Sequence, residues 1–125
     1  KSVVGIELIA EAIEDAGKNA DLNQLTNASF VVGQVELLLD PAFIAKYGKP
    51  DVVITDPPRA GMHPKVISHL LNAAPDRIVY VSCNPATQAR DLAMLSSDYA
   101  VVTAIPVDMF PQTHHIECIA LLKRK

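Results

Sequence analysis

The sequence predicts an α/β fold with a mostly parallel β-sheet and an antiparallel last strand. Short apolar runs typical of buried strands alternate with stretches of helical periodicity along the 125 residues. Such alternation favours helical crossovers that cover both faces of a parallel sheet. The last two apolar runs, 100–105 and 116–122, are joined by residues 106–115 without a helical pattern. That connection is too short for a parallel crossover, so we expect the final strand to run antiparallel to its neighbours.

The remaining elements follow from local patterns. Strands are predicted at residues 3–7, 28–32, 51–55, 77–82, 100–105 and 116–122. A helix follows the first strand, with an apolar face of Ile9, Ala12, Ile13, Ala16 and Ala20. Further helices are expected at 35–47, with a kink or boundary at Pro41 and a stop at Gly48, and at 63–74, where Pro64 suits the first turn. The last helix begins near Pro85, and its apolar face is predicted to consist of Ala89, Leu92, Ala93 and Leu95.

Length and composition indicate a single domain over residues 1–125, since 50% of the residues are hydrophobic. The net charge of −3 gives no field that would attract a polyanion to the whole chain, so any RNA affinity must be local. There is neither a signal-peptide pattern nor an apolar run of about 18 residues, which predicts a soluble, cytoplasmic protein. Cys83 and Cys118 are expected to be free thiols, because a reducing compartment disfavours their pairing.

Glu7 stands where the first strand passes into a helix. In nucleotide-binding α/β domains a Gly-rich turn follows the first strand, and an acid that binds the ribose hydroxyls follows the second. Glu7 fits that second position, and the chain contains no Gly-rich loop. A solvated acid favoured by the helix dipole is the alternative interpretation.

The Asp56-Pro57-Pro58-Arg59 segment follows an apolar strand. Its two prolines restrict the backbone and hold Asp56 rigidly at the edge of the sheet, which suits a group that orients a flat base. Arg59 is able to bind a phosphate or a carboxylate with two hydrogen bonds. The alternative is a proline-stiffened loop with a surface arginine.

Cys83 ends the next strand, just before the helix that begins near Pro85. The positive end of a helix dipole favours a thiolate, so Cys83 is a candidate nucleophile; inert packing is the alternative. Glu117 opens the last apolar strand, where a carboxylate is costly without a role or a partner, and it is a candidate general base. Cys118 alternates to the opposite side of that strand and is expected to pack.

The segment before Glu117 is a polar turn. Phe110 is expected to pack or to stack on a base. His114 and His115 are adjacent on this turn without a matching Cys or His pair, which makes them a poor ligand set, so no metal is expected in this chain.

Three ordered motifs resemble the RNA 5-methyluridine methyltransferases, which use S-adenosylmethionine. They are Asp56-Pro-Pro-Arg-Ala-Gly61, Val81-Ser-Cys-Asn-Pro-Ala-Thr87 with Arg90-Asp91, and Asp108-Met-Phe-Pro-Gln-Thr-His-His-Ile-Glu117. The resemblance covers essentially all of the chain, as the C-terminal part of a catalytic domain. It implies a Rossmann-like class I methyltransferase sheet that lacks its first strand and Gly-rich loop.

The resemblance also implies residue roles. Cys83 corresponds to the nucleophile, Glu117 to the proton acceptor, and Glu7 to the acid that binds the cofactor ribose. Asp56 corresponds to the acid near the cofactor and the target base, and Gln34 to an Asn or Asp that contacts adenine. Gln34 departs from the family pattern, which leaves that assignment open.

The mechanism implied is addition of the Cys83 thiolate to C6 of a uridine in rRNA or tRNA, methylation at C5, removal of the C5 proton by Glu117, and elimination of Cys83. The target base must first leave its stack or loop. The family's Gly-rich strand and RNA-binding barrel, and in some members an iron–sulfur cluster, lie upstream of Glu7. We therefore expect this chain to be a fragment that is inactive or nearly so alone, and its oligomeric state stays open.

Other functions remain open at this stage. An amino-directed methyltransferase has a similar acid-Pro-Pro motif but usually carries an aromatic residue where Arg59 stands, and it has no need of Cys83. A dehydrogenase would require a Gly-x-Gly-x-x-Gly motif, which is absent. Outside enzymology, a non-catalytic Rossmann-like binding remnant is the alternative.

Overall fold

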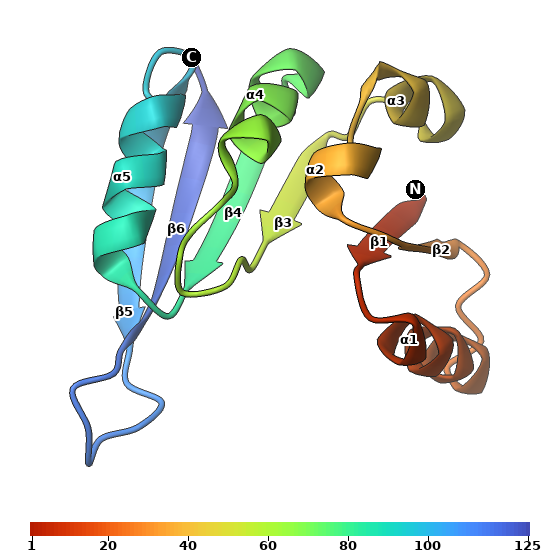
Figure 1. Cartoon of the computed structure of the whole chain (residues 1–125), viewed down its shortest axis with the longest axis horizontal. Helices are drawn as coiled ribbons and strands as arrows, with labels where there is room; N and C mark the ends of the chain where they lie inside the picture. Colours follow the sequence, from red (N-terminus) through yellow and green to blue (C-terminus); the bar gives the residue numbers. More distant parts are fainter. The chain divides into compact units, whose positions relative to one another are not determined.

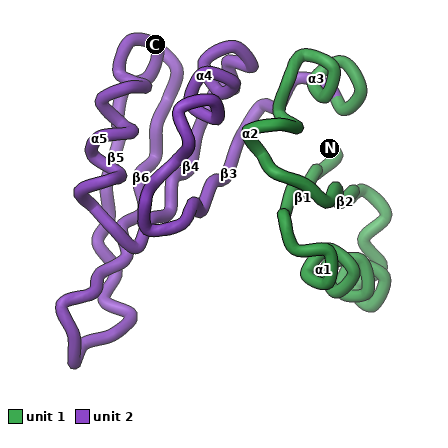
Figure 2. Tube along the Cα trace, in the orientation of Figure 1, with its two compact units in different colours: residues 1–47 green, residues 48–125 purple.

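A computed structural model describes all residues, Lys1–Lys125. The chain divides into two compact units, residues 1–47 and 48–125, which are coloured separately in Figure 2. Each unit has its own sheet, a two-stranded one in the first unit and a four-stranded one in the second. No helix is long and apolar enough to span a membrane.

The first unit is a parallel β-α-β structure followed by two short helices. Strand β1 (Val3–Glu7) pairs in parallel with β2 (Ala28–Val32), and helix α1 (Ala10–Leu22) connects them and packs on both. Two further helices follow, α2 (Val35–Leu38) and α3 (Pro41–Tyr47). The predicted boundary at Pro41 is confirmed, because proline cannot continue a helix and the Asp40 carboxylate caps α3 by accepting from the Phe43 N–H at 2.8 Å.

The second unit is a four-stranded sheet in the order β3-β4-β6-β5. Its strands are β3 (Val52–Thr55), β4 (Arg77–Ser82), β5 (Tyr99–Val107) and β6 (Glu117–Arg124). Strand β3 runs parallel to β4, whereas β6 runs antiparallel to both β4 and β5, so the predicted direction of the last strand is confirmed. The β5–β6 register shifts between Val101 and Thr103, which places a β-bulge at Val102.

Helices α4 (Pro64–Ala73) and α5 (Pro85–Leu95) lie against one face of this sheet (Figure 1). Both begin with proline at a first-turn position, preceded by a side chain that accepts from a helix N–H: His63 from Lys65 and Asn84 from Ala86. The core between helices and sheet contains Ile67, Leu70, Ile78, Tyr80, Leu95, Ala120 and Leu122.

The interior face of α5 differs from the predicted one. Its buried residues are Gln88, Asp91 and Leu95, whereas Ala89 and Ala93 are exposed and Leu92 is half-buried. Only Leu95 of the predicted apolar face is fully buried. Polar side chains take the other central positions because they have hydrogen-bonding partners in the sheet and in a neighbouring loop.

Candidate active site

Strand ends of the second unit bring Asp56, Cys83 and Glu117 to the same edge of one sheet. Asp56 follows β3, whose last residue Thr55 pairs with Tyr80 of β4. Cys83 directly follows β4, and Glu117 is the first residue of the antiparallel β6. The carboxyl ends of parallel strands and the start of an antiparallel neighbour meet at one sheet edge, which is where α/β domains bind their ligands.

Cys83 and Glu117 are the residues next to the last pair of the β4–β6 ladder. The last pair of that ladder is Ser82 with Cys118. Cys83 follows Ser82 in the sequence, and Glu117 precedes Cys118. Cys83 lies in a bend directly after β4, and Glu117 opens β6, so the two residues are neighbours at the end of the ladder. Both side chains are half-buried, and Cys83 is a free thiol, as is Cys118. A thiol and a carboxylate at the ends of neighbouring strands are chemical groups of the kind that can serve as a nucleophile and a base.

The loop that carries Asp56 and Arg59 is fastened to α5. The Arg59 carbonyl accepts from Asn84 Nδ2 at 3.1 Å and from Thr87 Oγ1 at 3.0 Å. A turn closes the loop, since the Gly61 N–H donates to the Pro58 carbonyl at 2.8 Å. The backbone at Arg59 is therefore fixed, although its side chain is exposed.

The Arg59 side chain contacts the segment that precedes β6. Its Nη1 lies 3.2 Å from Nδ1 of His115. A guanidinium only donates, so Arg59 is the donor where these two side chains share a hydrogen bond. The rings of His114 and His115 are 4.3 Å apart. No group of three or more His, Cys, Asp or Glu residues in the chain is arranged to hold a metal ion.

Phe110 lies on the same segment and is 57% exposed, so it is available for stacking rather than packed in the core. Its N–H donates to Asp108 Oδ1 at 3.2 Å, and its carbonyl accepts from the Thr113 N–H at 2.9 Å and from Thr113 Oγ1 at 3.0 Å. These hydrogen bonds form a local turn around an exposed aromatic ring.

In the first unit, Glu7 and Gln34 lie at one edge of the β1–β2 sheet. Glu7 ends β1, and its carbonyl accepts from the Gly33 N–H at 2.9 Å, so Gln34 comes directly after this contact. Glu7 Oε1 accepts from the Ile9 N–H at 2.9 Å, and Oε2 makes no hydrogen bond within the chain. Gln34 precedes α2 without capping it, and both side chains are exposed. Carboxylate and amide groups in these positions are free to bind hydroxyl and amine donors.

Sequence reasoning missed the part of the site that α5 contributes. Asn84, Gln88 and Asp91 follow one another at intervals of four and three residues, which places them on one side of a helix in line with Leu95. That spacing is the signal in the sequence, although polar residues at such positions usually lie on the solvent side of a helix.

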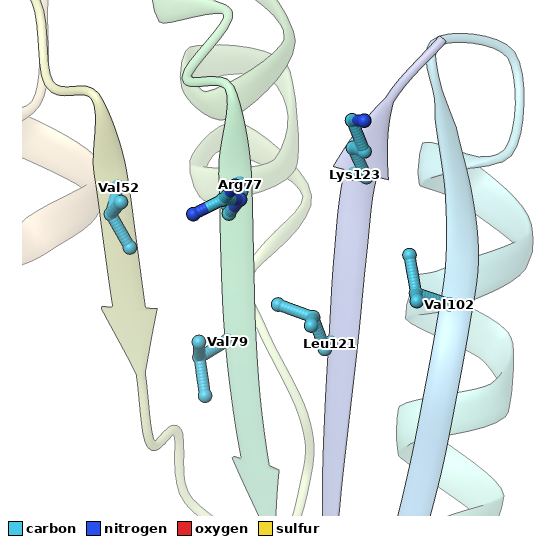
Figure 3. Close-up of a pocket in the computed structure, with 6 residues that line it drawn as sticks. All are labelled: Val52, Arg77, Val79, Val102, Leu121 and Lys123. Carbon is cyan, nitrogen blue, oxygen red and sulfur yellow. The ribbon is translucent and has the colours of Figure 1, made fainter.

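A hollow on the other face of the sheet has a different character. Along β4, the lining residues Arg77 and Val79 alternate with the buried Ile78 and Tyr80, so they point to the opposite face of the sheet. Figure 3 shows this face, with α4 and α5 behind the sheet. The lining residues are Val52, Arg77, Val79, Val102, Leu121 and Lys123. The lining holds no thiol and no carboxylate, so this hollow has no groups for the chemistry of Cys83 and Glu117.

The arrangement of strands and helices is that of class I S-adenosylmethionine-dependent methyltransferases. An N-methyltransferase, NodS from Bradyrhizobium japonicum in complex with S-adenosyl-L-homocysteine, superposes with a TM-score of 0.72 at 12% identity, covering 98% of this chain and 66% of that one. At that identity the likeness shows the fold alone. The tRNA (uracil-54, C5)-methyltransferase of Pyrococcus abyssi, in complex with S-adenosyl-L-homocysteine, is more similar, with a TM-score of 0.82 and 41% identity over 97% of this chain and 28% of that one.

The chain belongs to the tRNA (uracil-5-)-methyltransferase family, whose profile matches residues 1–125. Similar proteins include an uncharacterized RNA methyltransferase of Porphyromonas gingivalis, 60% identical over 124 residues, and one of Bacteroides thetaiotaomicron, 56% identical over 123 residues. Each alignment covers 98% of this chain, which spans about 27% of the length of these relatives.

Proposed function

We propose that this chain carries the reacting groups of an enzyme that methylates C5 of a uridine in rRNA or tRNA. The observation that supports this proposal is that Cys83 and Glu117 lie next to the last pair of the β4–β6 ladder, at the ends of neighbouring strands. Uracil C5 is a weak carbon nucleophile, and a thiol and a base on neighbouring strand ends are what activation at C6 and deprotonation at C5 require.

The chemistry follows from those two groups. The Cys83 sulfur forms a bond to C6, and the electron pair of the C5–C6 double bond makes C5 nucleophilic. After C5 has gained the methyl group, the Glu117 carboxylate removes the C5 proton, the double bond re-forms, and the C6–sulfur bond breaks to release Cys83. The sulfonium donor of the methyl group would leave as a neutral thioether, the C5 proton ends on Glu117, and the Cys83 thiolate that added to C6 is released again, so atoms and charges balance.

S-adenosylmethionine would supply the methyl group, and the donors and acceptors at the edge of the β1–β2 sheet fit its nucleoside. Glu7 offers a carboxylate oxygen without a partner in the chain, which suits the ribose hydroxyls. Gln34 offers a side-chain amide that makes no capping bond, which suits the adenine edge. The P. abyssi relative at 41% identity binds S-adenosyl-L-homocysteine, which supports this assignment.

Three residues of the second unit are assigned to the target uridine and its RNA strand. Asp56, held by two prolines, is proposed to orient the base and to contact the cofactor. Arg59, fixed through its carbonyl, is proposed to bind a phosphate. Phe110, exposed on its turn, is proposed to stack on a base.

We further propose that the 125-residue chain is inactive or nearly so by itself. Within the second unit, Val52 and Ile54 of β3 are 47% and 74% exposed. Apolar strand residues with that exposure indicate a sheet that is completed by further protein. The proposed activity therefore belongs to a longer polypeptide with the length of the relatives.

The test uses RNA that contains 5-fluorouridine, because a fluorine at C5 cannot be removed by a base and the cysteine adduct is then trapped. In a polypeptide of the relatives' length, with S-adenosylmethionine present, we expect a denaturation-resistant protein–RNA complex. Cys83→Ala is expected to abolish the complex and methyl transfer, whereas the matched control Cys118→Ala retains both. Glu117→Gln is expected to accumulate an adduct on ordinary uridine, since the C5 proton is no longer removed. Normal turnover by Cys83→Ala would refute the proposal.

A further inference from the structure

Helix α5 turns a polar side, not an apolar one, toward the sheet and the loop of the candidate site. Asn84, Gln88 and Asp91 lie at the helical spacing normally occupied by core residues, and Gln88 and Asp91 are only 3% and 0% exposed. We call these three residues the polar stripe. Burying a polar side chain costs free energy unless the side chain is hydrogen-bonded. The hydrogen-bonding partners of the polar stripe therefore show which segments it holds in place.

Asp91 holds the loop that follows β3. Its Oδ2 accepts from the Met62 N–H and from the Tyr80 hydroxyl, each at 2.7 Å. Its Oδ1 accepts from Arg90 Nε at 2.9 Å and Nη2 at 2.7 Å, and the same Nη2 donates to the Ala60 carbonyl at 2.9 Å. One buried carboxylate thus joins the helix, strand β4 and the loop that begins at Asp56.

The loop fits against this pair without spare room. Gly61 has a φ of +83°, a conformation that favours glycine. A Cβ added there would lie 2.6 Å from both Arg90 Nη2 and Asp91 Oδ2. The absence of a side chain at Gly61 is what allows the backbone to reach the Arg90–Asp91 pair.

Gln88 joins the two strands that carry the reacting groups. Its Nε2 donates to the Tyr80 carbonyl of β4 at 2.9 Å and to the Cys118 carbonyl of β6 at 3.0 Å. Cys118 directly follows Glu117. The third member of the stripe, Asn84, directly follows Cys83 and donates to the Arg59 carbonyl. The segments that bear Asp56, Cys83 and Glu117 are therefore all hydrogen-bonded to α5 or its N-cap.

We infer that the polar stripe consists of positioning residues, which hold the Asp56–Gly61 loop, the end of β4 and the start of β6 in fixed relation. This inference rests on the proposed function. Stability alone does not require such a stripe, because a buried polar group and its partner can often be replaced together by apolar residues without loss. Directional hydrogen bonds instead fix positions, and a displacement of about 1 Å in a catalytic group can lower a rate about 100-fold.

The experiment compares three variants in the same longer polypeptide, each assayed at a temperature where it is folded. Gln88→Leu removes both strand contacts, and Arg90→Lys keeps the charge but loses the two-pronged contact with Asp91. Leu95→Val is the matched control, since it shortens a buried side chain of the same helix outside the stripe. We expect kcat for methyl transfer to fall at least about tenfold in the first two variants, with KM for S-adenosylmethionine within about twofold of wild type. Leu95→Val should keep kcat within about twofold.

Equal kcat in all three variants at matched stability would overturn the inference. A second readout does not depend on activity: hydrogen exchange of the Met62 amide in the 125-residue chain. Arg90→Lys should speed this exchange relative to Leu95→Val, because the acceptor Asp91 loses its fixed partner. Unchanged exchange would overturn the positioning role. Failure of the unmodified longer polypeptide to form the 5-fluorouridine adduct would instead refute the proposed function.

Discussion

The Tyr80 hydroxyl donates a 2.7 Å hydrogen bond to the Asp91 carboxylate, and neither residue has any exposed surface. A hydrogen bond to a charged acceptor contributes about 1.5–3 kcal/mol, roughly twice the value for a neutral acceptor. Two predictions follow from this hydrogen bond. One concerns the free energy of unfolding at neutral pH, and the other concerns its decrease at alkaline pH.

Tyr80→Phe is expected to lower the free energy of unfolding by about 1.5–3 kcal/mol, since the ring still fills its place and only the charged hydrogen bond is lost. Tyr99→Phe is the matched control, because its hydroxyl donates to the neutral Pro75 carbonyl at 2.8 Å and its loss should cost about 0.5–1.5 kcal/mol. Urea unfolding at neutral pH measures both. A smaller loss for Tyr80→Phe than for Tyr99→Phe would contradict the prediction.

The pKa of Tyr80 is raised from its ordinary value of 10.0, chiefly by burial and then by the hydrogen bond to Asp91. The folded state thus keeps the phenol proton that the unfolded state loses. The contribution of Tyr80 to stability is complete below about pH 10 and falls as pH rises above it. The free energy of unfolding, measured from pH 8 to 11, should decline less steeply with pH in Tyr80→Phe than in the unmodified chain. Identical slopes of free energy against pH would contradict this prediction. Burial also raises the pKa of Tyr99, so Tyr99→Phe should reduce the slope as well.

Glu7→Gln is expected to weaken binding of S-adenosylhomocysteine at least about tenfold, because an amide accepts ribose hydroxyls less strongly than a carboxylate does. Glu11→Gln is the control, since Glu11 lies exposed in the first turn of α1, away from the strand end. Calorimetric titration of the longer polypeptide measures both affinities. Equal affinities for the two variants would remove Glu7 from the proposed cofactor site.

The isolated chain is expected to self-associate with increasing concentration through β3. This strand is the outer member of its sheet, so one side of its backbone is unpaired within that sheet, and it also carries the exposed apolar side chains Val52 and Ile54. Ile54→Lys should shift sedimentation toward the monomer, since a lysine on an edge strand opposes pairing. Ser68→Lys, on the exposed side of α4, serves as the control. If Ile54→Lys associates as strongly as the unmodified chain, self-association occurs through a surface other than β3.

Much of the fold could be predicted from the sequence because its signals are local. Alternating apolar runs located all six strands, and the prolines at 41, 64 and 85 marked helix starts. The insertion of β6 between β4 and β5 could not be predicted, since pairing between distant segments leaves no mark in a local pattern. The prediction that Ala89 and Ala93 lie on the buried face of α5 was wrong for a related reason. Gln88 and Asp91 can be buried there because their hydrogen-bonding partners come from other segments of the chain.

The candidate site divides in the same way. Asp56, Cys83 and Glu117 could be predicted as candidate site residues from the sequence, because each stands directly at a strand boundary. In the structure all three lie at the same end of the strands of one sheet. The contact between Arg59 and His115 was beyond sequence reasoning, since it depends on two loops that meet only after β3, β4 and β6 have assembled.

The pairing of β6 also decides what Cys83 meets. A slip of one residue along β4 would put Cys118 across from Cys83, and facing thiols at that spacing can oxidise to a disulfide. The same slip would turn Ala120 and Leu122, which are 0% and 1% exposed, away from the helices and into solvent. The burial of Ala120 and Leu122 therefore favours the register in which Cys118 pairs with Ser82 and not with Cys83.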